Sequence, residues 1–222
     1  MSMLQPLLIV VLAFAQTGEP TLFLDLTTAE VQAMDRSKTV GCHSGGGVMT
    51  SGVPFRRPQL TLRLSIDHLN GNTFKRGDVL IADVLLTNTG DKPVLLPWDP
   101  DSDIVYGKDC KGLPTPRPPT LEGSLALKLL DHEGQGPFVG GHFLYARRDE
   151  APTCRVLAPQ QSARLRVGGM FYPTAARTGG SLAPGANTFR LVAIFSLTDS
   201  ALPNAYEPVV SANHQNLALT EK

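Results

Sequence analysis

The sequence lacks an excess of charge of either sign, because its 222 residues include 20 basic and 20 acidic ones. Only 18% of the residues are charged, below the roughly 25% of ordinary soluble domains. A neutral chain carries no basic footprint for nucleic acid and no cationic patch for anionic lipid. We therefore expect no nucleic-acid partner.

Long hydrophobic runs are also missing. The apolar run Leu7 to Phe14 is too short to cross a bilayer, which takes roughly 20 residues as a helix. The small-x-small pattern Ala13-Phe14-Ala15 ends it, so residues 1–15 are predicted to be a secretory signal peptide. No Lys or Arg precedes the run, and a buried N-terminal strand is the alternative interpretation. The signal predicts an exported protein, periplasmic or extracellular, with no transmembrane or lipid anchor after cleavage.

Cysteine is scarce, and its odd count restricts the disulfide pattern. In an oxidising compartment Cys42, Cys110 and Cys154 are all candidates for pairing. Cys110 and Cys154 both fall in the β-rich part of the chain, whereas Cys42 lies in a glycine-rich stretch before it. The simplest pairing is Cys110 with Cys154, which leaves Cys42 free or bridged to another chain. Three unpaired thiols are the alternative.

Glycine and proline are abundant, with 21 and 18 residues, which indicates many turns and few long helices. From Leu60 to Asp67 apolar and polar residues alternate, as they do in a strand with one buried face. A second strand is predicted at Val79 to Asn88, with Leu80, Ala82, Val84 and Leu86 on one face. Thr89 to Lys92 is predicted to turn it back into Pro93 to Trp98 as an antiparallel hairpin. Further strands are predicted at 104–106, 124–130, 143–145, 162–167, 188–197 and 209–210.

These short strands, broken by glycine and proline, predict an all-β protein with an immunoglobulin-like antiparallel β-sandwich over residues 59–211. Residues 16–58 are predicted to form a short helix and a Gly/Pro-rich linker. Thr27 and Glu30 have capping-box spacing, so the helix is placed at Thr28 to Arg36. Residues 212–222 are predicted to be a frayed C-terminal tail.

The run from Gly77 to Val94 resembles the immunoglobulin-like domains of the bacterial intracellular proteinase inhibitor family, and is similar to adhesion-type modules of bacterial surface proteins. The shared features are a strand ending in Thr87-Asn88-Thr89-Gly90, a charged turn and a Pro-led strand. The segment Leu157-Ala158-Pro159-Gln160-Gln161 is similar to the turn-and-strand segment of such domains, with Gln160 in the place of the usual glycine. The resemblance covers about 35 residues and implies the fold rather than a function.

Candidate chemical sites are few. Asp99, Asp101 and Asp103 have the alternating carboxylates that open calcium loops, but Ile104 stands where such a loop needs glycine. A solvated acidic turn is the alternative to a weak calcium site. Cys42 beside His43, before a glycine run, suggests an activated thiolate, but adjacent side chains rarely face each other productively. We expect no catalytic residues, no cofactor and no other metal site.

Trp98 is the single tryptophan, and it is predicted either to fill the core of the sandwich or to anchor a partner from a loop tip. The leading hypothesis is an exported, non-enzymatic binding or interaction module of the cell envelope. Its partner would be another protein or an envelope component. One alternative is a protease inhibitor with an exposed loop at Trp98 to Asp103. A second is a hydrolase that uses Cys42 and His43.

Overall fold

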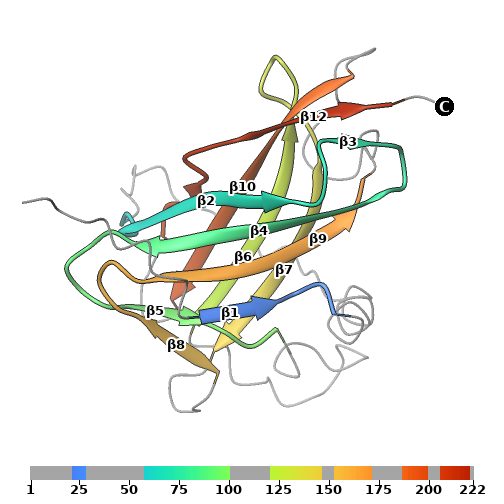
Figure 1. Ribbon diagram of the computed structural model, residues 1–222. Helices are drawn as coiled ribbons and strands as arrows, with labels where there is room; N and C mark the ends of the chain where they lie inside the picture. Colours follow the sequence, from blue (N-terminus) through green and yellow to red (C-terminus); the bar gives the residue numbers. More distant parts are fainter. Residues whose placement is uncertain are drawn as a thin grey trace, which may run out of the picture.

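The computed structural model describes residues 22–28, 58–100, 121–146, 153–171, 187–199 and 206–220. Throughout this part of the chain the secondary structure is β, and no helix occurs in it (Figure 1). The predicted all-β class is therefore confirmed. The leader, and the predicted helix apart from Thr28, lie outside the described residues. Residues 22–25, in the region predicted to be helix and linker, form a strand instead. Within these residues no helix is long and apolar enough to span a membrane.

The strand predicted at 104–106 lies outside the described residues, and the other predicted strands are present, several with longer bounds. Val79 to Asn88 forms a strand with the predicted ends, whereas the strand expected at 143–145 begins at Phe138. In chain order the strands are β1 (Leu22–Asp25), β2 (Leu62–Leu69), β3 (Thr73–Phe74), β4 (Val79–Asn88), β5 (Val94–Pro97), β6 (Leu121–Leu130), β7 (Phe138–Ala146), β8 (Cys154–Leu157), β9 (Ser162–Met170), β10 (Thr188–Asp199), β11 (Val209–Val210) and β12 (Gln215–Leu219).

Two sheets face each other, and Figure 1 shows the smaller one in front. Among the described strands its order is β1-β9-β4-β2, and the larger sheet has the order β3-β12-β10-β6-β7 with β11 beside β10. A short ladder of β5 and β8 lies at one end. The pairs β1–β9 and β3–β12 are parallel, which corrects the expectation of purely antiparallel sheets. In both pairs a short strand joins the sheet from a part of the chain remote in sequence, so no hairpin fixes its direction.

The core lies between the two sheets and is built by the alternation seen in the sequence. Leu80, Ala82, Val84 and Leu86 of β4 are fully buried, as predicted. They pack in one cluster with inward residues of the larger sheet such as Leu127. Each fully buried leucine contributes about 1.5–3 kcal/mol relative to an exposed one. This continuous apolar layer fixes which face of each strand is exposed.

The predicted hairpin between β4 and β5 is wrong. Both edges of β4 are taken by β2 and β9, and β5 pairs with β8 instead. Buried Asn88 stabilises the path of the chain from β4 toward β8. Its Nδ2 donates to the carbonyl oxygens of Lys92 (2.8 Å) and Leu157 (2.9 Å). Its Oδ1 accepts the N–H of Gly90 at 3.0 Å. This side chain joins the turn after β4 to the strand β8.

The expectation of a frayed tail over 212–222 is also wrong. Residues 215–219 form β12, which lies between β10 and β3 with Leu217 buried. Ahead of it, Asn213 accepts the N–H of Ile66 and donates to the Ile66 carbonyl, both at 2.8 Å. The side-chain amide thus acts as a strand partner where the β2–β4 register shifts. The strand predicted at 209–210 is present as β11.

The backbones of the two sheets approach each other closely where β7 passes β9, and glycine pairs line both strands there. A Cβ placed on Gly169 would lie 2.7 Å from the Gly140 Cα, and one on Gly140 would lie 2.8 Å from the Gly168 carbonyl oxygen. Both distances are below any ordinary Cβ contact, so the backbones meet directly. These glycines close one side of the two-sheet layer.

Candidate binding groove

Trp98 and Asp99 are both held by backbone hydrogen bonds to neighbouring segments of the chain. The Trp98 side chain is half-buried against the core, and the Trp98 backbone N–H donates to the Thr153 carbonyl at 2.8 Å. Asp99 forms two main-chain hydrogen bonds with Tyr145, at 2.9 and 3.2 Å, as an isolated bridge on β7. Asp101 and Asp103 lie outside the described residues, so the calcium site stays a prediction. The role of Trp98 as a partner anchor likewise stays a prediction.

The predicted cysteine chemistry is not tested. Cys154 is half-buried at the start of β8, where its register partner on β5 is Pro97. Cys42, His43 and Cys110 lie outside the described residues. In the described part of the chain, no group of three His, Cys, Asp or Glu residues could hold a metal ion.

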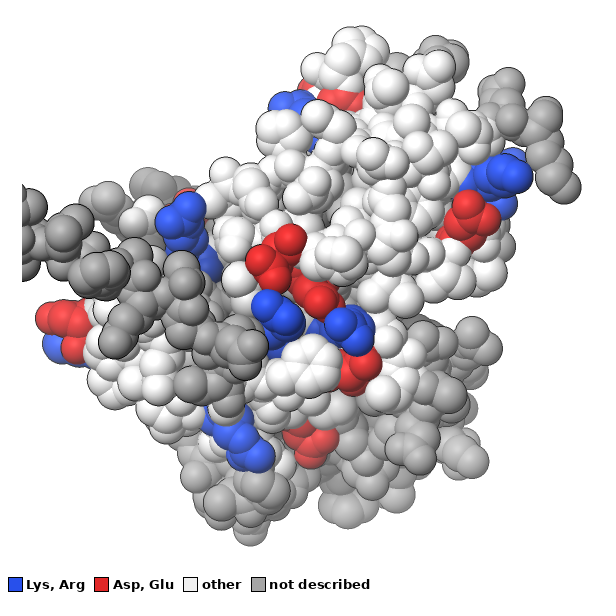
Figure 2. Space-filling model, in the orientation of Figure 1, with Lys and Arg blue, Asp and Glu red and all other residues white. Residues whose placement is uncertain are grey.

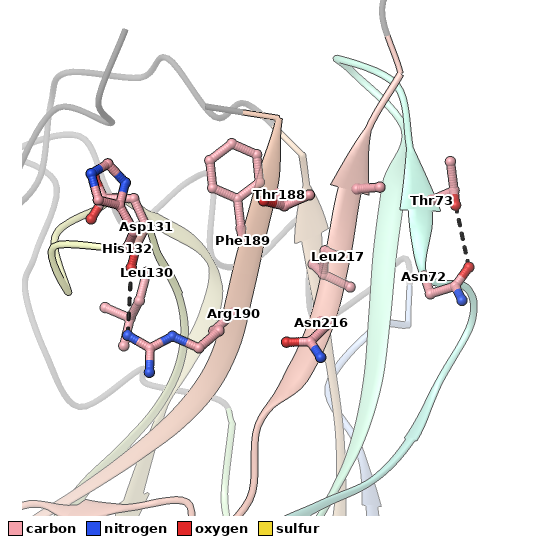
Figure 3. Close-up of a pocket in the computed structure, with 11 residues that line it drawn as sticks. Asn72, Thr73, Leu130, Asp131, His132, Thr188, Phe189, Arg190, Asn216 and Leu217 are labelled. Atoms are coloured by element: carbon pink, nitrogen blue, oxygen red, sulfur yellow. Dashed lines mark hydrogen bonds between the residues drawn. The ribbon is translucent and has the colours of Figure 1, made fainter. Parts of the chain in front are cut away.

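An open groove of about 420 Å³ crosses one end of the larger sheet (Figure 3). Four segments remote in sequence form it: the end of β6, the start of β10, β12, and the turn into β3. Phe189 and Leu217 are buried and supply an apolar floor. The walls carry amide, hydroxyl and guanidinium groups. An apolar floor with a few polar groups is the usual make-up of a binding site.

Arg190 supplies the positive charge of the groove. The β-register places it between Leu130 and Asn216. Its Nη2 lies 3.5 Å from the Asp131 carbonyl oxygen, at the outer limit of a hydrogen bond (Figure 3). It forms no ion pair with a carboxylate among the described residues. Toward the described residues, most of its five N–H donors are therefore unused.

The carboxylate of Asp131, the residue whose carbonyl Arg190 approaches, is hydrogen-bonded to the backbone of its own turn. Asp131 is 2% exposed, and its Oδ1 accepts the N–H groups of Glu133 and Gln135, each at 2.9 Å. The carboxylate thus holds the turn between β6 and β7. The His132 side chain is exposed and lies 3.7 Å from Glu133. Among the described lining residues, no nucleophile is hydrogen-bonded to a base.

The opposite wall is neutral and polar. Thr73 donates its hydroxyl to the Asn72 side-chain oxygen at 3.3 Å, and Asn216 is exposed on the neighbouring strand β12 (Figure 3). Amides and hydroxyls both donate and accept hydrogen bonds. The groove therefore offers polar groups of both kinds and one cation. The sequence analysis did not find it, since no spacing along the chain connects Asn72, Arg190 and Asn216.

Charged side chains gather on the outer face of the smaller sheet (Figure 2). Arg166 of β9 donates two hydrogen bonds to the Asp83 carboxylate of β4, of 2.7 and 3.1 Å. The Arg166 Nη1 also lies 4.0 Å from the carboxylate of Asp25 in β1. Arg164 pairs with Asp67 of β2 at 3.0 Å. The hydrogen bond from Arg166 lowers the pKa of the Asp83 carboxyl, although burial opposes it, and raises the pKa of Arg166. These pairs link the four strands of this sheet.

No protein-family model matches the sequence, and no curated protein matches it. The alkylpurine DNA glycosylase AlkC of Pseudomonas fluorescens, solved with DNA containing an abasic site analog, is 10% identical over 73% of this chain and 31% of its own, with a TM-score of 0.33. The sporulation control protein Spo0M of Bacillus subtilis is 7% identical over 73% of this chain and 50% of its own (TM-score 0.34).

AvmM, which catalyses macrocyclization in alchivemycin A biosynthesis, is 13% identical over 78% of this chain and 95% of its own (TM-score 0.36). The chain thus spans half or less of the first two proteins. Likenesses this low carry no argument about family or function.

Proposed function

We propose that this protein is an exported, non-enzymatic binding or interaction module of the cell envelope. The observation that carries the proposal is the groove, where Arg190 and side-chain amides surround an apolar floor and the guanidinium has no carboxylate partner among the described residues. Fixed donors on rigid strands suit recognition of a polar partner. The partner would be another protein or an envelope component.

An immunoglobulin-like sandwich is part of the proposal, and the strand order supports it. In such folds strands A, B and E share one sheet, while G, F, C and C′ share the other. Here β2-β4-β9 and β12-β10-β6-β7 have that order. The parallel addition of β3 to β12 extends the second sheet.

A protease inhibitor remains the alternative, and one observation favours it. The stem of the loop that starts at Trp98 is anchored by the hydrogen bonds to Thr153 and Tyr145. An inhibitory loop needs such a fixed base, because ordering it on binding costs affinity. Inhibition assays against serine, cysteine and metalloproteases test this alternative. The second alternative, a hydrolase, rests on Cys42 and His43 alone.

Export is tested by the start of the mature chain. We expect it to begin at Gln16, because the small-x-small pattern ends at Ala15. N-terminal sequencing or intact mass of the protein recovered from its native cell envelope measures this. A product that still carries Met1 would contradict export by this leader.

Binding is tested by capture from envelope extract with the mature chain as bait. We expect a partner that is captured by the wild type and lost in Arg190→Ala and Asn216→Ala. Arg63→Ala is the matched control, because Arg63 is exposed on β2 of the other sheet. Equal capture by Arg190→Ala would contradict the groove as the site. Turnover of an ester, peptide or amide substrate that disappears in Cys42→Ala would contradict the non-enzymatic proposal.

A further inference from the structure

The N-terminal strand β1 is a four-residue addition to the edge of the smaller sheet (Figure 1). It runs parallel to β9, with Leu22 opposite Ala163 and Asp25 opposite Arg166. The N–H of Leu26 continues the ladder by donating to the Arg166 carbonyl at 2.9 Å. A short edge strand of this kind is held by few hydrogen bonds, so its side chains decide how well it docks.

The inward side chains of this segment are leucines. Leu22 and Leu24 are partly buried against the core, and Leu26 is 4% exposed. Their spacing of two residues sends all three to the same face of the strand. The edge of β9 thus accepts alternate apolar side chains at the rim of the core.

The outward side chains meet one guanidinium. The Arg166 Cζ lies 5.5 Å from the centre of the Phe23 ring, and its Nη1 lies 4.0 Å from Asp25 Oδ2. Asp83 holds the same guanidinium through two hydrogen bonds, of 2.7 and 3.1 Å. Arg166 is therefore fixed in place by the sheet itself before β1 docks, and it offers a cation to an aromatic and an acidic residue.

The connection from β1 to the rest of the sandwich is long. Strand β2 lies at the opposite edge of the same sheet, three strand spacings or roughly 15 Å away. Residues 29–57 lie in the connection and, if extended, would reach roughly 100 Å. The covalent link therefore does not force β1 onto its own copy of β9.

We infer that the edge of β9 is a strand-acceptor site for an extended apolar–aromatic–apolar–acidic–apolar segment, and that residues 22–26 of a second copy occupy it by strand exchange. Exchanging an identical element is a low-cost route to a dimer. The covalent connection keeps a chain's own strand at a raised local concentration. Exchange therefore increases with protein concentration. This inference is independent of the groove.

The first experiment measures whether the acceptor site exists. A fluorescent peptide of residues 21–28 is titrated into the full mature chain and into its Leu24→Asp/Leu26→Asp variant, whose own strand cannot dock. We expect β1 to leave the edge of β9 in at most about a tenth of the wild-type molecules. The opened variant should then bind the peptide about tenfold tighter or more. A peptide carrying Asp25→Lys should bind more weakly, as should the opened variant with Arg166→Ala. Equal weak binding by wild type and a folded opened variant would overturn the inference.

The second experiment detects the second copy and leaves the buried leucines of β1 in place. Phe23 and Arg164 are register partners, so Phe23→Cys in one tagged chain and Arg164→Cys in another are mixed, each in a Cys42→Ser background. Strand exchange predicts a mixed disulfide that increases with protein concentration. Arg63→Cys on β2 replaces Arg164→Cys as the control. No mixed disulfide, or an equal yield with Arg63→Cys, would show that the strands are not exchanged.

Discussion

Gln160 is the one residue other than glycine, in the described ranges, whose φ is positive (62°). It follows Pro159 in a tight turn that is closed by the Gln161 N–H donating to the Ala158 carbonyl at 3.1 Å. Proline followed by a residue of positive φ is the pattern of a type II turn, which favours glycine at the second position. The departure from the usual glycine, noted in the sequence, therefore falls on the residue with an unfavourable backbone.

Replacing Gln160 by glycine should stabilise the fold. The left-handed conformation costs an ordinary residue about 1–2 kcal/mol, while glycine loses about 0.5–1 kcal/mol more backbone entropy on folding. We expect Gln160→Gly to raise the free energy of unfolding by about 0.5–1 kcal/mol in urea titration. Gln135→Gly, in a turn without positive φ at that residue, should not stabilise. An equal gain in both variants would contradict the backbone explanation.

At the scale of elements, the contact between β7 and β9 depends on two glycine pairs rather than on interlocking side chains. Gly169→Ala should lower the free energy of unfolding by about 1–3 kcal/mol, because its Cβ would force the two backbones apart. Gly71→Ala is the matched control, since its Cβ would meet Phe74 at an ordinary 3.6 Å. Thermal or urea denaturation of both variants measures the difference. Equal effects of the two substitutions would be inconsistent with a backbone contact at Gly169.

The ion pair between β4 and β9 should give the stability a component that depends on pH. The folded pKa of Asp83 lies below its ordinary value of 3.8, so its contribution is full above about pH 4 and is lost as the pH falls through the folded pKa. Asp83→Asn should cost about 1–3 kcal/mol at pH 7 and should flatten the loss of stability on acidification.

Asp67→Asn removes an exposed pair with Arg164 and serves as the control. Exposed pairs contribute at most about 1 kcal/mol, so we expect little effect at pH 7. Urea unfolding at several pH values from neutral to acid measures both variants. If Asp83→Asn lost stability on acidification as steeply as the wild type, the Asp83–Arg166 pair would not be its source.

At the scale of the whole molecule, a disulfide is predicted to join the segment after β5 to the start of β8. Non-reducing peptide mapping of the exported protein should find Cys110 linked to Cys154. The link should stabilise the domain by about 2–4 kcal/mol, and reduction should remove that amount. A link from Cys42 to either residue would show the pairing to be wrong.

The sequence by itself determined where the long strands lie and which of their faces are buried, but it did not predict the short strands β1, β3, β8 and β12. Val79 to Asn88 became β4 with unchanged ends, and Val84 is buried on its predicted face. This succeeds because alternation with period two is a local property, set by the pleat of a single strand. Export, the disulfide and the calcium site are predictions from the sequence on which the described residues do not bear.

Only the tertiary structure decided which strand pairs with which. Strand β5 pairs with β8 rather than with β4, and Leu217 is buried because β10 and β3 flank its strand. Pairing depends on which sheet edges remain open once the core has formed, and no local pattern encodes that. The groove could not be predicted from the sequence for the same reason. Asn72, Arg190 and Asn216 become neighbours only when three strands, remote in the chain, are hydrogen-bonded side by side.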